Sequence, residues 1–230
     1  TVRSTGDVGV INSLGGGTAR GVTSTNSGTI EGVGAGLRVD TINFANTGTI
    51  TATDGLGVDL GSYAGFDNQS GGVVNGTTAA VGTSNSAFNA VIQNAGILNG
   101  DVNLIPPGAY DFSSDIFIDN GGTVNGNLLL GGGDDILVTD LGRNAPFAGV
   151  TGTVDAGTGN DIVRYRVITD ASSTLSIPTS FEGLGYEIAN NATLMLTGSG
   201  QHDLSLAFSG QGSVDITADL SQTDHIVLNM

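Results

Sequence analysis

Apolar and polar residues alternate along most of this chain in short runs, and turns rich in Gly and Asn separate the runs. Alternation with a period of two predicts β-strands that bury one face and expose the other. The polar positions carry mainly Thr, Ser, Asn and Asp, which favour strands and turns, whereas helix surfaces favour Glu, Lys and Gln. The pattern therefore predicts an all-β fold.

A short unit recurs through the first half of the chain. It consists of Asn, one variable residue, Gly and a β-branched pair, as in Asn-Ser-Gly-Thr-Ile at 26–30, and after the first two copies the unit recurs in looser form. The spacings between successive copies are 20, 22, 26 and 26 residues. The five copies begin at Asn26, Asn46, Asn68, Asn94 and Asn120.

This period fits one coil of a parallel β-helix, whereas a propeller blade needs about 40 residues. Asn-Gly pairs at 75–76, 99–100 and 125–126 follow the same period and suit left-handed corners. About nine coils of 20–26 residues would make a rod of roughly 40 Å. The repeat fades after Val167, so we expect coils over 1–167 and irregular coils or a β cap of the same domain over 168–230.

Composition narrows the possible partners and chemistry. The chain has no Cys, which excludes disulfides and Cys-based zinc or catalytic sites. Its net charge of −16 disfavours nucleic acid and anionic lipid as partners. No apolar run is long enough for a transmembrane helix. Because the strand pattern is already under way at Thr1, we expect the chain to be a segment of a longer protein.

The Asn-x-Gly-Thr-Ile coils, the absence of Cys and Lys, and the run GNLLLGGGDD at 126–135 resemble bacterial autotransporter passenger domains over nearly the whole chain. The resemblance implies a right-handed parallel β-helix displayed on the surface of a Gram-negative bacterium and exported through a β-barrel, the only membrane connection expected. It also implies adhesion, aggregation or biofilm formation. We therefore expect a non-enzymatic extracellular structural or adhesion protein that binds carbohydrate or protein on another cell, or itself.

Two copies of the pattern Gly-x-Gly-x-Asp-x-apolar, at 131–137 and 157–163, resemble the calcium-binding nonapeptide of secreted repeat toxins. A Gly-rich turn exposes carbonyls, and Asp adds an anionic oxygen suited to Ca²⁺. The copies lie 26 residues apart, so Asp135 and Asp161 should meet on neighbouring coils and could bind Ca²⁺. The alternative is a coil corner in which each Asp caps its own turn. No other cofactor is predicted.

Two alternative functions stay open. Paired carboxylates such as Asp111, Asp115 and Asp119 can hydrolyse glycosidic bonds, which would make the chain a polysaccharide-active β-helix enzyme. Asp115 and Asp119 should share a strand face, but no basic residue lies between Arg38 and Arg143, so a solvated acidic face is the preferred interpretation. The second alternative is a calcium-stabilised structural module of a secreted repeat protein.

The remaining polar groups give weaker signals. His202 and His225 do not show the spacing of a metal site. The cluster Arg164-Tyr165-Arg166 combines positive charge with an aromatic ring. We expect its two arginines to face solvent and to pair with Asp161 or Asp170.

Overall fold

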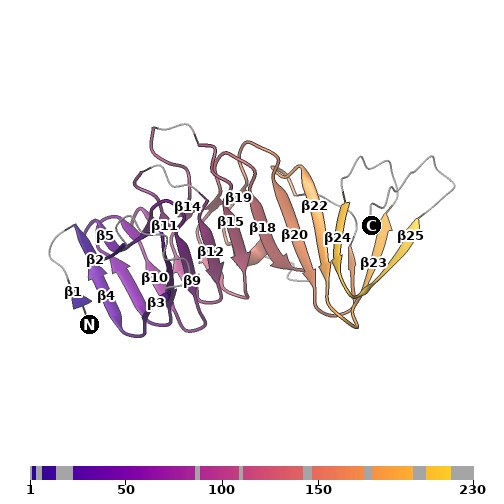
Figure 1. Ribbon diagram of the computed structural model, residues 1–230, viewed down its shortest axis with the longest axis horizontal. Helices are drawn as coiled ribbons and strands as arrows, with labels where there is room; N and C mark the ends of the chain where they lie inside the picture. Colours follow the sequence, from indigo (N-terminus) through magenta and orange to yellow (C-terminus); the bar gives the residue numbers. More distant parts are fainter. Residues whose placement is uncertain are drawn as a thin grey trace.

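The computed structural model describes residues 2–3, 7–13, 23–85, 89–108, 111–141, 147–173, 178–198 and 206–218. It is an all-β parallel solenoid of about 7 turns with 2% helix, which confirms the predicted fold class. Figure 1 shows the coils stacked side by side along one long axis. The sequence predicts about nine coils, which is too many, because the regular three-strand coil does not continue through the C-terminal part.

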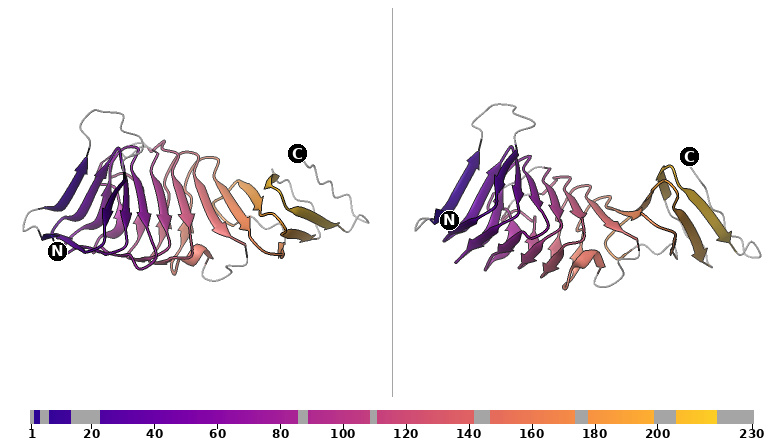
Figure 2. Two further views of the ribbon diagram at one scale, coloured as in Figure 1. Left: turned by 60° about the horizontal axis from the view of Figure 1, so that its bottom comes forward. Right: turned by 90° about the horizontal axis from the view of Figure 1, so that it is seen from below.

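Three parallel sheets, here named A, B and C, run along the rod, and the chain visits them in that order in each coil (Figures 1 and 2). Sheet A contains β1 (Val2–Arg3), β4 (Thr29–Gly32), β7 (Thr49–Ala52), β10 (Val73–Asn75), β13 (Ile97–Asn99) and β16 (Thr123–Asn125). Sheet B contains β2 (Val8–Ser13), β5 (Ala35–Asp40), β8 (Leu56–Leu60), β11 (Ala79–Gly82), β14 (Val102–Asn103), β17 (Leu128–Leu129) and β19 (Val154–Asp155). Sheet C contains β3 (Thr23–Asn26), β6 (Asn43–Asn46), β9 (Gly65–Asn68), β12 (Val91–Asn94), β15 (Ile116–Asp119), β18 (Ile136–Asp140), β20 (Ile162–Val167), β22 (Gly183–Ile188) and β24 (Leu206–Gly210).

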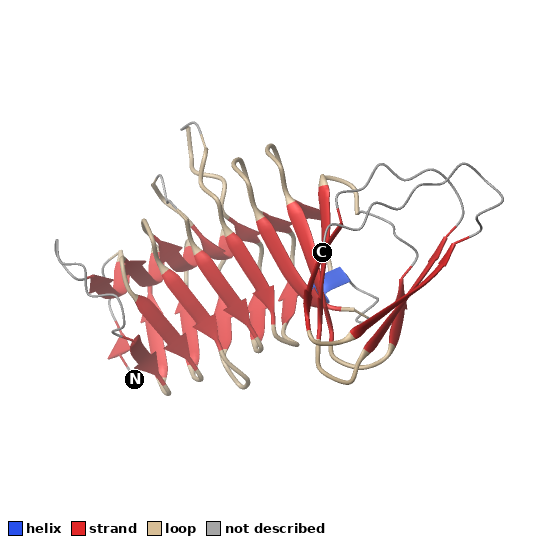
Figure 3. Ribbon diagram, turned by 45° about the vertical axis from the view of Figure 1, so that its right-hand side comes forward, coloured by secondary structure: helices blue, strands red, loops and turns tan. Residues whose placement is uncertain are grey.

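The C-terminal part keeps sheet C but replaces the other two sheets. The strands β21 (Ala171–Ser173), β23 (Thr193–Gly198) and β25 (Ser213–Ala218) form a separate parallel sheet, sheet D. One 3-10 turn occurs among the described residues, η1 (Phe147–Gly149), and it contacts the last strand of sheet A, β16 (Figure 3). Sheet D thus begins where the Asn-x-Gly repeat has faded from the sequence.

The core consists of apolar side chains stacked in register from coil to coil. In sheet C, Phe44, Phe66, Ile92, Phe117 and Leu137 pair successively and are all buried. Sheets A and B contribute similar columns of Ile, Val and Leu. Because each coil lays its apolar residues on those of the next, every inner coil depends on both neighbours for its core.

A buried amide ladder runs beside this core at the end of the sheet C strands. The side-chain NH₂ of each Asn donates to the side-chain oxygen of the next, at 2.8 Å from Asn26 to Asn46 and 2.9 Å for the two following steps, which end at Asn68 and Asn94. The next position in register is Asp119, and not Asn120 as the repeat predicts. The reason is that the turns after the strands differ in length, which shifts the register by one residue.

Candidate functional site: a buried carboxylate column

The most variable edge of the rod is the corner between sheets B and C. Among the connections that join a sheet B strand to the next sheet C strand from residue 41 onward, the shortest is 41–42 and the longest is 104–115. Figure 3 shows connections of unequal length projecting along one edge of the rod. The segments are 41–42, 61–64, 83–90, 104–115, 130–135 and 156–161.

Three acidic residues stack directly at this corner, and we name Asp115, Asp135 and Asp161 the carboxylate column. Each immediately precedes a strand of sheet C, and the strands that follow are paired in register. The Asp135 side chain accepts a hydrogen bond from the backbone N–H of Asp115 at 2.7 Å. The Asp161 side chain accepts from the N–H of Asp135 at 2.8 Å. Each carboxylate therefore binds the backbone of the coil before it.

The column is closed at both ends in the same way. The Asp115 carboxylate accepts from the N–H of Ala90 at 2.7 Å. At the other end, the Glu182 carboxylate accepts from the N–H of Asp161 at 2.8 Å. Five successive coils are thus joined by four acidic side chains, which satisfy backbone donors that the corner takes out of the sheet ladder.

Two oxygen atoms in the column have no hydrogen-bond partner. They are Oδ2 of Asp135 and Oδ2 of Asp161, and both are buried. Both side chains are fully buried, so these oxygens are shielded from bulk solvent. A buried, unpaired carboxylate oxygen is costly when the group is ionised. The column is therefore strained as long as it carries its full negative charge.

Burial and mutual repulsion shift the protonation of these groups. Burial raises the pKa of Asp115 from an ordinary 3.8 to about 6, and its hydrogen bonds oppose that rise. Burial raises the pKa of Asp135 to about 8, with further contributions from the charges of Asp115 and Asp161. Burial also raises the pKa of Asp161, helped by the nearby Glu182. Asp135 can therefore hold its proton at neutral pH.

The glycine turns before Asp135 and Asp161 are stacked on one another as well. The N–H of Thr158 donates to the Gly131 carbonyl, and the N–H of Gly133 donates to the Thr158 carbonyl, both at 2.9 Å. Gly157 has a φ of +99°, and a Cβ there would collide with the Gly131 carbonyl. These turns require glycine because the backbones of two coils approach closely at this point.

The predicted proximity of Asp135 and Asp161 agrees with this geometry, but the predicted capping does not. Each caps the backbone of the preceding coil instead of its own turn. Among the described residues, no group of three or more His, Cys, Asp or Glu side chains is arranged to hold a metal ion. Calcium binding at Asp135 and Asp161 stays a prediction.

The predicted solvated face at Asp115 and Asp119 is wrong. Both side chains lie on the same side of β15, as predicted, but that side faces inward, and each residue is 1% exposed. The Asp119 carboxylate accepts from the Thr139 hydroxyl at 2.9 Å and from the N–H of Gly121. Asp111 lies close to Asp115, because the Ser113 hydroxyl bonds to both carboxylates. A carboxylate pair in an inward-facing position does not meet a polysaccharide in solution.

The cluster Arg164-Tyr165-Arg166 also differs from its prediction. Arg166 forms an ion pair with Asp140 at 2.8 Å, in place of Asp161 or Asp170, and donates to the Asn120 side chain and the Asp119 carbonyl. Arg164 is exposed, in line with the prediction. Tyr165 is half-buried and stacks on Tyr186 with ring centres 5.9 Å apart. The cluster therefore ties coils together. His202 and His225 lie outside the described residues.

Sequence reasoning missed Ser113, Glu182 and the role of the Asn ladder. The recurring first Asn of the repeat was the available signal for the ladder, because a residue repeated once per coil stacks on itself in a solenoid. Ser113 and Glu182 follow segments of irregular length and give no such signal.

Comparisons with known proteins leave the family open. No protein-family model matches the chain, and no curated protein or solved structure matches it. Within the described part of the chain, no helix is long and apolar enough to cross a membrane.

Proposed function

We propose that this chain is a non-enzymatic structural rod of the autotransporter passenger type, displayed outside a Gram-negative cell, that attaches the cell to other surfaces or cells. The observation that carries the proposal is the continuous in-register stacking of coils, through sheet C from β3 to β24. Stacking of this kind makes a stiff, elongated body, and a stiff body holds weak contact sites at fixed spacing. Several weak contacts held in this way give firm attachment by multivalency.

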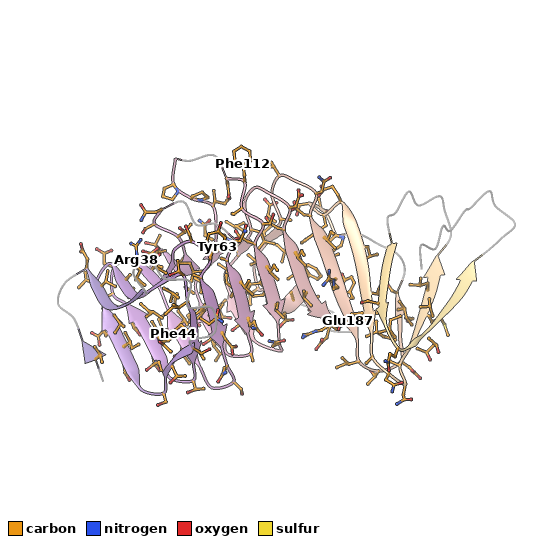
Figure 4. The ribbon with its side chains drawn as sticks, viewed as in Figure 1. Arg38, Phe44, Tyr63, Phe112 and Glu187 are labelled. Atoms are coloured by element: carbon orange, nitrogen blue, oxygen red, sulfur yellow. The ribbon has the colours of Figure 1, made fainter. Side chains whose placement is uncertain are left out.

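The corner between sheets B and C is the best candidate for the contact surface. Tyr63 is 61% exposed and Phe112 is 77% exposed, and both lie on segments of this corner. Figure 4 labels both side chains, with Phe112 at the upper edge of the rod and Tyr63 lower, over the coils. Exposed aromatic rings offer flat apolar surface to a sugar ring or to an apolar patch on a protein. The net charge of −16 favours neutral or cationic partners.

An adhesion assay tests this proposal. The chain is displayed on a non-adherent bacterium, and attachment to host cells, glycan-coated surfaces and cells of the same strain is compared with that of an unrelated passenger. We expect increased attachment or aggregation, reduced in a variant that combines Tyr63→Ser with Phe112→Ser. Ile97→Ser is the matched control, because Ile97 is an exposed apolar residue of sheet A. Attachment no greater than that of the unrelated passenger on any surface would contradict the proposal.

The enzymatic alternative is tested in the same preparation. Release of reducing ends from polysaccharides of several charges would favour a polysaccharide-active enzyme. Asp115 and Asp119 are poor candidates for that activity because they are buried. Hydrolysis that survives Asp115→Asn and Asp119→Asn would point to carboxylates elsewhere in the chain.

A further inference from the structure

Four Asn-Gly dipeptides lie within the described coils, and three of them end strands of sheet A. They are Asn75-Gly76, Asn99-Gly100, Asn120-Gly121 and Asn125-Gly126. An Asn followed by Gly is prone to deamidation, which begins when the glycine nitrogen attacks the Asn side chain and closes a five-membered ring. No side chain on glycine shields its nitrogen from the neighbouring carboxamide. Since the dipeptide is the same at all four places, only the local structure distinguishes them.

In three of the four dipeptides the glycine N–H is held by a hydrogen bond. Ring closure requires the glycine nitrogen to approach the Asn side chain. The hydrogen bond that holds the glycine N–H must therefore break first. The three bonds run from Gly76 to the Asn99 carbonyl at 3.2 Å, from Gly100 to the Asn125 carbonyl at 3.2 Å, and from Gly121 to the Asp119 carboxylate at 2.9 Å.

Gly126 is different, because its N–H has no hydrogen-bond acceptor among the described residues. Sheet A ends at β16. The coil that follows pairs with it at the isolated bridge between Val124 and Val150, and the Gly152 N–H donates to the Gly126 carbonyl at 2.9 Å, which leaves the Gly126 N–H without a partner in the described part of the chain. The Asn125-Gly126 peptide unit is therefore held only through its carbonyl, which accepts from Gly100. The Asn99-Gly100 unit is held at both its carbonyl and its N–H.

The side chains show the same contrast. Asn75, Asn99 and Asn125 form a second amide ladder, in which each NH₂ donates to the preceding side chain, at 2.8 Å for the last two steps. Asn75 and Asn99 are half-buried, and their side chains both donate and accept. Asn125 is exposed and ends the ladder. Asn120 is also exposed, but Arg166 donates to its oxygen at 2.8 Å.

We infer that Asn125 is a site of spontaneous deamidation in the folded protein. The Gly126 nitrogen attacks Cγ of Asn125, the bond from Cγ to Nδ2 breaks, and ammonia leaves with the proton from Gly126. Water then opens the resulting succinimide ring at either carbonyl, which leaves Asp or isoaspartate. The net change is one water gained and one ammonia lost, so no oxidant, metal or enzyme is required.

Deamidation at this position changes the ladder locally. The carboxylate that replaces the NH₂ of Asn125 cannot donate to the Asn99 oxygen, and the two oxygens repel one another. Isoaspartate in addition lengthens the backbone at the last residue of β16. The reaction therefore loosens the end of sheet A and adds one negative charge. It does not depend on the proposed adhesive function.

Mass spectrometry of aged protein tests the inference. The purified chain is incubated at mildly alkaline pH and physiological temperature, folded or in denaturant, and digested with a protease that cleaves before Asp. The peptide 119–133 then contains both Asn120 and Asn125, which tandem spectra separate. In the folded protein we expect Asn125 to react roughly tenfold faster than Asn99, the factor expected from one additional backbone hydrogen bond of about 1.4 kcal/mol.

In denaturant all four sites should react at similar rates, because the protection is structural. Asn125→Gln should remove the early acidic species seen by isoelectric focusing, since glutamine would have to close a larger ring. Asn120→Gln, the matched exposed control, should leave that species in place. Equal rates at all four sites in the folded protein, earlier reaction at Asn75, Asn99 or Asn120, or no reaction at Asn125 would each overturn the inference.

Discussion

Replacing Asp135 by Asn tests whether the carboxylate column limits the stability of the rod. The substitution keeps an oxygen that can accept the Asp115 N–H at the position where Asp135 now accepts it at 2.7 Å. It removes the ionisable group and replaces the unpartnered Oδ2 by an NH₂ group. The new NH₂ group has a buried acceptor in the same column, the unpartnered Oδ2 of Asp161 in the next coil.

The sign of the pH effect follows from the raised pKa values. Because the pKa of Asp135 is about 8 in the folded chain and near 3.8 when unfolded, the folded state holds a proton that the unfolded state releases. Stability is therefore highest below the unfolded pKa and is lost as the pH rises through the folded one. At about 1.36 kcal/mol per pKa unit, the loss of stability from Asp135 is at most roughly 6 kcal/mol. Asp115, with a pKa of about 6, adds a smaller loss that is complete at lower pH.

Guanidinium unfolding followed by far-UV circular dichroism measures this loss across a series between about pH 5 and pH 9. The unmodified chain should lose stability steadily as the pH rises, and Asp135→Asn should show a much flatter profile and the higher midpoint at the alkaline end. Asp134→Asn is the matched control, because Asp134 is the exposed neighbour and should leave the steep profile unchanged. A limiting role of the column is refuted if the stability of the unmodified chain does not fall with pH, or if the stability of Asp135→Asn falls as steeply.

Three further outcomes are expected. Asn68→Ala should lower the free energy of unfolding by about 2–4 kcal/mol, because it interrupts the buried amide ladder on both sides. Asn99→Ala, in the half-buried ladder, should lower it by about 1 kcal/mol, and denaturant unfolding of both variants measures the difference. Gly157→Ala should cost about 3 kcal/mol or more because of its backbone collision, and Gly108→Ala, with φ +70° and open space, about 1 kcal/mol. If calcium binds the column, excess Ca²⁺ should raise the melting temperature by several degrees, chelator should reverse the rise, and Asp161→Asn should abolish it; an unchanged melting temperature would contradict calcium binding.

The solenoid could be predicted because its signal repeats once per coil. A copy spacing of 26 residues was enough to place Asp135 beside Asp161. The corner segments that end in these two residues, 130–135 and 156–161, have equal lengths. Asp115 could not be placed in the same way. It lies 20 residues before Asp135 and is the last residue of the long corner segment 104–115, so counting residues does not give its coil position.

The face that a residue occupies is harder to predict than its coil, because successive side chains of a strand point to opposite faces of the sheet. One extra residue in a turn decided that Asp119, and not Asn120, continues the buried ladder of Asn94. From Asp119 the same position leads to Thr139, which donates to it, and then to Tyr165 and Tyr186, which stack. An amide ladder needs a donor and an acceptor in each coil, whereas stacked rings need neither. The change from Asn to Tyr therefore occurs after Thr139, whose hydroxyl ends the hydrogen-bonded column. At the same place along the rod the Asn-based repeat disappears from the sequence, although sheet C continues.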